Sequence, residues 1–195
     1  MKIYINFEKK IYMKILSLSF ILLVLIIFSC KENSEFKVVE EINCNAEEVN
    51  IEKGGFKSDK KFIDSFFTNS KQQTAEFAFS GKYSMKLDKN NQYGFAYTLY
   101  NVKANDHYRI TVWRMSKSGK GALVISHKDS KLFYEVQKNA KLDNDPKWGQ
   151  MDLDIIIPSQ VDGENLRVYC WNPDTINPVY FDDLKIQYLN KPKEN

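Results

Sequence analysis

Two segments of the chain share the pattern Arg-x-x-x-Trp, with apolar residues at alternate positions. They read Arg109-Ile110-Thr111-Val112-Trp113 and Arg167-Val168-Tyr169-Cys170-Trp171. In an extended strand, alternate side chains point to opposite faces, so each arginine shares a face with its tryptophan, and Tyr169 joins the second pair. Aromatic rings stack on the C–H faces of sugar rings, and arginine donates to hydroxyl or carboxylate groups. We expect Trp113 and Trp171 to lie on one partly open face, near Arg109 and Arg167.

An alternative for this face is that residues 54–70 cover it. That segment is rich in phenylalanine, with Phe62, Phe66 and Phe67, and its own structure is the least certain in the chain. The tryptophans would then form a second layer of core, as large aromatic side chains mostly do.

The chain offers little that could perform catalysis. Its two histidines, His107 and His127, lack metal-binding spacing, and no Gly-rich phosphate loop is present. Asp152 and Asp154 share one face of a strand, but the other face is apolar, which is typical of a solvated outer side. We therefore predict that the protein is not an enzyme.

An apolar run of 14 residues, from Ile15 to Phe28, follows Met13-Lys14 and ends at Ser29-Cys30. It suits a signal peptide and is short for a membrane span of ~20 residues. A small residue before cysteine predicts a bacterial lipoprotein signal over residues 1–29, with Cys30 acylated; an uncleaved anchor helix is the alternative. Residues 31–35 resemble surface-export signals of Bacteroidetes lipoproteins. We expect an outer-membrane, lipid-anchored and surface-exposed protein, with the acyl chains providing the membrane contact.

Charge and cysteine content limit the class of the remaining 166 residues. Residues 1–29 carry four lysines and one glutamate, which account for the net charge of +3, so the rest of the chain is formally neutral. A neutral body lacks the basic footprint of a nucleic-acid binder. Cys44 and Cys170 could form a disulfide outside the cytoplasm, or Cys170 could pack as a small buried hydrophobe.

Short segments with period-2 alternation recur along the chain, and no window holds a helical period. We expect a tether over residues 30–40, a β-sandwich domain over 41–190 and a tail over 191–195. Turn residues separate the expected strands, which are residues 48–51, 74–79, 82–87, 93–102, 107–115, 122–127, 131–137, 150–157, 166–171 and 179–189. The fold class predicted is all-β, an antiparallel β-sandwich or jelly roll.

Four segments resemble galactose-binding-like jelly rolls, the fold class of many carbohydrate-binding modules. They are residues 78–87, which include Ser80-Gly81-Lys82-Tyr83-Ser84; residues 108–113, Tyr108-Arg109-Ile110-Thr111-Val112-Trp113; the strand that follows Trp148 and ends Ile156-Ile157-Pro158; and residues 180–186, which begin Tyr180-Phe181-Asp182-Asp183-Leu184. The resemblance covers roughly residues 74–189. The opening Asn-Gly-x-Phe-Glu motif of such modules is missing, and Asn45-Ala46-Glu47-Glu48 is its nearest counterpart.

The resemblance also implies a structural calcium ion. Asp182 or Asp183 would be its ligand from the closing strand, Glu47 or Glu48 the early acidic ligand, and Lys82 would offer a carbonyl oxygen. Calcium takes six to eight oxygen ligands. The alternative is that Asp182 and Asp183 are merely solvated charges at a strand end.

These observations favour a non-catalytic carbohydrate-binding lipoprotein whose partner is a glycan. A protein of a different class remains open: a structural or protein-interaction lipoprotein of the cell envelope, with a protein partner and no glycan. Exposed aromatic side chains on a concave face favour the first, and aromatic side chains buried under residues 54–70 favour the second.

Overall fold

The computed structural model describes residues 36–58, 66–142 and 147–190. The chain divides into two units, Met1–Glu35 and Phe36–Asn195, and all described residues lie in the second. The expected signal peptide, Cys30 and the C-terminal tail therefore lie outside the described residues. Among the residues that are described, no helix is long and apolar enough to cross a membrane.

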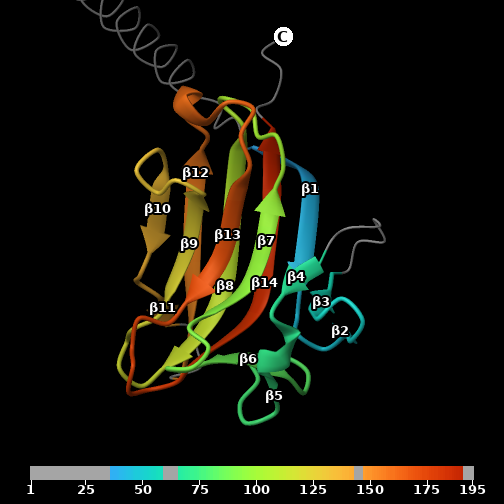
Figure 1. The fold of residues 1–195 in the computed structure, drawn as a ribbon, viewed down its shortest axis with the longest axis vertical. Helices are drawn as coiled ribbons and strands as arrows, with labels where there is room; N and C mark the ends of the chain where they lie inside the picture. Colours follow the sequence, from blue (N-terminus) through green and yellow to red (C-terminus); the bar gives the residue numbers. More distant parts are fainter. Residues whose placement is uncertain (1–35, 59–65, 143–146, 191–195) are drawn as a thin grey trace, which may run out of the picture. The chain divides into compact units, whose positions relative to one another are not determined.

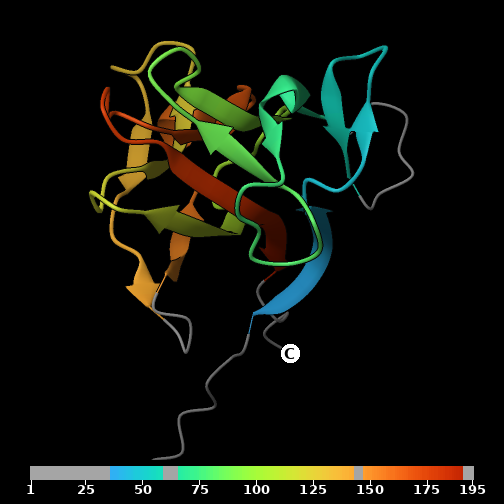
Figure 2. The same ribbon diagram turned by 90° about the horizontal axis from the view of Figure 1, so that it is seen from below.

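Two seven-stranded antiparallel sheets build the molecule (Figures 1 and 2). The first sheet has the order β11-β12-β8-β14-β6-β5, and β1 also pairs with β14. Its strands are β1 (Lys37–Cys44), β5 (Gln73–Thr74), β6 (Ser84–Leu87), β8 (His107–Ser116), β11 (Lys141–Leu142), β12 (Trp148–Ile156) and β14 (Val179–Asn190).

The second sheet has the order β10-β9-β13-β7-β4-β3-β2. Its strands are β2 (Val49–Asn50), β3 (Gly55–Lys57), β4 (Phe66–Thr68), β7 (Tyr93–Leu99), β9 (Ala122–His127), β10 (Tyr134–Gln137) and β13 (Leu166–Trp171). In Figure 1, β13 and β7 lie over β8 and β14 of the first sheet. Two short 3-10 helices, η1 (Ser70–Gln72) and η2 (Ser159–Val161), complete the described elements.

Successive strands change sheet, which is how a jelly roll is wound. From β6 to β9 the chain alternates between the first and the second sheet, and it does so again from β12 to β14. The predicted fold class, an all-β antiparallel sandwich of jelly-roll type, is confirmed.

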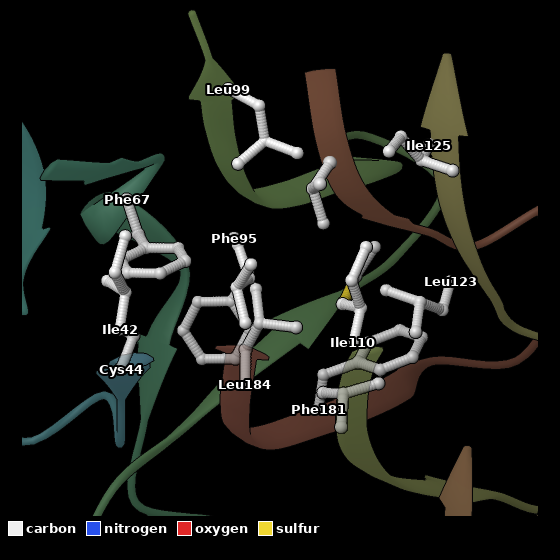
Figure 3. Close-up of a cluster of buried hydrophobic side chains, with 14 of the residues drawn as sticks. Ile42, Cys44, Phe67, Phe95, Leu99, Ile110, Leu123, Ile125, Phe181 and Leu184 are labelled. Atoms are coloured by element: carbon white, nitrogen blue, oxygen red, sulfur yellow. The ribbon is translucent and has the colours of Figure 1, made fainter. Parts of the chain in front are cut away.

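The inner faces of the two sheets form one apolar core (Figure 3). Period-2 alternation supplies it: Ile110 of β8, Ile125 of β9 and Val168 of β13 are fully buried. Cys44 and Cys170 lie in this core as buried thiols. Burial raises the pKa of the Cys170 thiol, and the nearby Cys44 adds to that shift.

The strand boundaries differ from expectation where the alternation is weak. Residues 74–79 were expected as a strand, but only Gln73 and Thr74 pair, and the chain then loops over the outer face of the first sheet. At the N-terminus, β1 begins at Lys37, which pairs with Asn190, so the sandwich begins before residue 41 and the expected tether is shorter. The exposed, mostly polar start of β1 gives no alternation signal.

A small second cluster of aromatic side chains covers part of the outer face of the first sheet. Met115, Trp148 and Tyr180 are buried there on three neighbouring strands, and Phe79 and Trp113 pack against them. The rings of Phe79 and Trp113 are stacked, with 3.9 Å between centroids and 14° between planes. Trp113 is therefore a packing residue that holds the loop before β6 onto the sheet.

We expect Trp113→Ala to lower the free energy of unfolding by about 3 kcal/mol, because it removes a large ring from a packed cluster. Tyr93→Ala, which truncates a half-exposed ring on the other sheet, should cost less than about 1 kcal/mol, near the range for surface changes. Urea unfolding curves of both variants measure the difference. Equal destabilisation would contradict the structural role of Trp113.

Candidate functional site

Four aromatic side chains lie on the outer face of the second sheet: Tyr93 of β7, Tyr134 of β10, and Tyr169 and Trp171 of β13. We call them the aromatic platform. Strand register brings them together, because Trp171 pairs with Tyr93, and Tyr134 pairs with Ser126 of β9, the strand beside β13. The inward positions of β13 are apolar, so its remaining side chains face outward.

Three rings of the platform contact one another, and its four rings range from exposed to partly buried. Tyr93 and Trp171 are parallel, with 6.2 Å between ring centroids and 6° between planes, and Tyr93 and Tyr169 have 5.9 Å between centroids. The exposed fractions of Tyr93 and Tyr134 are 51% and 39%. Burial raises the pKa of Tyr134, with smaller contributions from Tyr169 and Tyr93.

Two hollows flank the ring pair of Tyr93 and Trp171. The larger, of 570 Å³, is lined by side chains of β7, β9 and β13, among them Tyr93, Tyr169 and Arg167. The smaller, of 340 Å³, is lined by Trp171 together with Lys120 and Lys138. An outer sheet face with open rings between two hollows can hold an extended, flat-sided ligand.

Arg167 belongs to β13, the central one of the three strands that line the larger hollow. It pairs with Thr98 of β7 on one side and with Ser126 of β9 on the other, so it is flanked by two hydroxyl groups. Its side chain is exposed. The same face therefore combines rings for stacking with hydrogen-bond donors and acceptors.

The expectation that Trp113 and Trp171 share one face is wrong. Trp113 and Arg109 belong to β8 of the first sheet, whereas Trp171 and Arg167 belong to β13 of the second. Each pair lies on the outer face of its own sheet, and the core separates the two. Trp113 lines a small hollow of 290 Å³, yet Phe79 covers its ring.

Arg109 is engaged in an ion pair. Its Nε and one terminal nitrogen donate to Oδ2 of Asp154 at 3.0 and 2.9 Å, and His107 bonds the other oxygen of that carboxylate. Burial acts to raise the pKa of Asp154, but the hydrogen bonds from His107 and Arg109 outweigh it and hold the pKa low. Asp154, expected as a solvated charge, is thus paired with Arg109 and His107.

Residues 54–70 do not cover the aromatic platform with any side chain that the structure describes. β3 and β4 instead extend the second sheet beyond β7, with Thr68 paired to Ala96. Phe56 and Phe67 point into the core, where they contact Phe95. Phe62 lies outside the described residues.

Sequence reasoning missed Tyr93 and Tyr134. Phe95 has a φ of 46°, and the pairing of β13 with β7 shifts register between Val168 and Cys170. This bulge breaks the period-2 pattern of β7, so the face of Tyr93 could not be read from alternation. Tyr134 begins the edge strand β10, which has no buried position to mark its inward face.

The predicted calcium ligands Glu47, Lys82, Asp182 and Asp183 meet at the loop of residues 79–83. Oδ2 of Asp182 accepts from the backbone N–H groups of Phe79 and Ser80 at 2.8 and 3.2 Å. Oε1 of Glu47 accepts from the N–H groups of Lys82 and Tyr83, both at 2.8 Å. Glu48 is elsewhere: it forms an exposed ion pair with Lys57.

Hydrogen bonding limits which of these oxygens could bind a cation. Asp182 is fully buried, and its second oxygen accepts from the N–H of Asp183, so both oxygens face donors. Burial, aided by the charge of Asp183, raises the pKa of Asp182 to about 7. Among the described residues no three acidic, histidine or cysteine side chains are grouped to hold a metal, so calcium would need backbone carbonyls and water besides Glu47 and Asp183.

Comparison with known proteins gives structural likenesses only. No family model matches the chain, and no curated protein matches it. The CBM22-1 xylan-binding domain from Paenibacillus barcinonensis has 16% identity and a TM-score of 0.48, covering 82% of this chain and 99% of that one. A xylan-binding domain from CBM 22 has 13% identity, a TM-score of 0.47 and coverages of 77% and 94%. A Stig cyclase from Fischerella sp. TAU has 13% identity, a TM-score of 0.46 and coverages of 84% and 92%.

Calcium binding at residues 79–83 stays a prediction. We expect calcium to raise the melting temperature over that in chelator, because an ion bound only by the folded state stabilises it by RT ln(1 + [L]/Kd), about 2.7 kcal/mol at 100 times Kd. Glu47→Gln should remove the difference while keeping the oxygen that accepts the two N–H groups. Glu48→Gln is the matched control and should retain it. Identical melting of the parent protein in chelator and in calcium would mean that the backbone N–H groups alone hold these carboxylates.

Proposed function

We propose that the outer face of the second sheet binds carbohydrate without chemical conversion. The observation that carries the proposal is the aromatic platform beside Arg167: four rings on one open sheet face, next to a hollow of 570 Å³. Sugar rings present apolar C–H faces and polar hydroxyl edges. Stacked rings meet the first, and Arg167, Thr98 and Ser126 meet the second.

The chemistry of the lining supports the proposal of binding without reaction. His127 is the titratable acid–base candidate there, and both its nitrogens are occupied: Nε2 contacts Oε2 of Glu164 at 3.2 Å, and Nδ1 accepts from the N–H of Asp129 at 3.1 Å. The side chain is buried. His127 therefore supports the end of β9, and the face is left with groups that bind and orient.

Alanine substitutions in the platform test the proposal. Tyr169→Ala and Trp171→Ala should each weaken binding to the recognised glycan by about 1–3 kcal/mol, the range for aromatic stacking platforms. A glycan array with the unit of residues 36–195 identifies the ligand, and titration calorimetry gives the loss.

Two controls separate binding from folding in that test. Tyr100→Ala removes a ring that is 73% exposed and lies outside the platform, so it should leave affinity unchanged. Trp113→Ala should lower stability while leaving affinity intact below its melting temperature. Full affinity in both Tyr169→Ala and Trp171→Ala would exclude the platform. If residues 36–195 bind no glycan but bind a protein of the cell envelope, the alternative of a structural or protein-interaction lipoprotein is supported.

We further propose that Cys30 carries lipid and anchors this body to the outer membrane. The support is the sequence, in which an apolar run of 14 residues ends at Ser29-Cys30. Cys30→Ala should lose labelling by an alkyne fatty acid and remain uncleaved, as read by gel mobility of cell extracts. Cys44→Ala is the matched control and should keep the label. Acylation that persists in Cys30→Ala would end the proposal.

A further inference from the structure

Cationic side chains gather on the candidate face, although residues 30–195 as a whole are formally neutral. The larger hollow is lined by Arg167 and Lys128, and the smaller by Lys120 and Lys138. Among the described residues that line either hollow, none is aspartate or glutamate. Four positive charges therefore surround the aromatic platform without an acidic lining residue.

The side chains of Arg167, Lys120, Lys128 and Lys138 form no ion pair with a described residue. Within the part of the chain that the structure describes, Lys57, Lys86, Lys185 and Arg109 are among the lysines and arginines that form ion pairs, whereas the four cations of the face form none. Glu164 is the carboxylate beside the larger hollow, and it contacts His127. Arg109, the equivalent arginine on the first sheet, is neutralised by Asp154. Of the two arginines at these matching positions, Arg167 is the one that has no carboxylate partner among the described residues and is exposed to an external anion.

Strand register places the cations at both ends of the platform. Lys128 follows His127, which pairs with Leu166, so it lies at the Arg167 end. Lys120 and Lys138 lie at the Trp171 end, since Ala122 pairs with Trp171 and Gln137 pairs with Leu123. Arg167 and Trp171 are four residue steps apart along β13, a distance of roughly 13 Å between their backbones. A ligand that contacts both ends must be an extended chain.

We propose that the ligand is an anionic polysaccharide, with carboxylate or sulfate groups that pair with the cations while its sugar rings stack on the platform. This inference rests on the proposed function, because it specifies the glycan class for the same face. Guanidinium forms paired hydrogen bonds with a carboxylate, so Arg167 is the residue that recognises the anion most directly. The lysines act as point charges at the two ends.

The test compares matched polymers on the full chain purified in detergent. The probes are polyuronates, the same polymers after carboxyl reduction, sulfated polysaccharides, polyglutamate and anionic phospholipid vesicles. We expect polyuronates or sulfated polymers to bind at least tenfold more tightly than the reduced, neutral polymers, and to weaken as salt rises, because exposed charges are screened. Which acidic polymer binds distinguishes carboxylate from sulfate.

Substitutions assign the effect to the face. Arg167→Gln should weaken binding of the acidic polymer about tenfold, the value of one charge-assisted hydrogen-bonding contact, and weaken neutral-polymer binding by a smaller factor, because glutamine still donates to sugar hydroxyls. Lys120→Gln combined with Lys138→Gln should act in the same direction. Arg109→Gln, at the matching position of the first sheet, is the control and should change neither.

The outcomes separate this inference from the proposed function. Equal binding of acidic and reduced polymers overturns the inference and leaves carbohydrate binding intact. Equal binding of polyglutamate, or of vesicles by the Cys30→Ala protein that lacks the proposed lipid, also overturns it, since charge alone would then suffice. Failure of every polysaccharide overturns both proposals.

Discussion

The packing of two apolar sheet faces against each other is the constraint on which the candidate site depends. Burial of Ile110, Ile125 and Val168 fixes which side of each strand points inward. Every neighbouring residue is then directed outward, to one of two faces with the core between them. On β13, Arg167, Tyr169 and Trp171 point outward because the residues that alternate with them are buried in the core. The core thus positions the platform, and side chains that bind nothing inside the protein are displayed as a group.

The two outer faces show how different surroundings give the same sequence pattern different roles. On β8, Arg109 meets Asp154 across the strand pair, and the ring of Trp113 meets Phe79 from the loop of residues 75–83. On β13, Arg167 meets Thr98 and Ser126, and Trp171 meets Tyr93. On β8, the charge of Arg109 and the ring of Trp113 therefore both have partners within the protein. On β13, the ring of Trp171 is only partly buried, and the charge of Arg167 has no carboxylate partner among the described residues.

Much of the fold could be predicted from the sequence because strand alternation is a local property. Strands β9 and β13 match their expected bounds, and β8 and β14 differ by a residue at one end. Sheet membership is not local: nothing in a period of two tells which sheet a strand joins, so Trp113 and Trp171 were expected to share a face. Tyr93 was missed for a related reason, since the bulge at Phe95 reverses the alternation within β7. The platform residues of β13 could be found because they follow unbroken alternation.

Rings and charges contribute differently to recognition on such a face. Stacking is worth about 1–3 kcal/mol per ring by alanine substitution, and it accepts many ring structures because it needs only a flat apolar surface. Exposed charges each contribute less in salt solution, since they are solvated in the free protein and screened in the complex. On the proposed face, the cations would affect the selection of ligands more than the affinity, because the residues that line the two hollows include four cations and no aspartate or glutamate, which favours anionic ligands over cationic ones. If the face binds carbohydrate as proposed, the platform would therefore set the strength of binding, and the cations around it would determine which chains are bound.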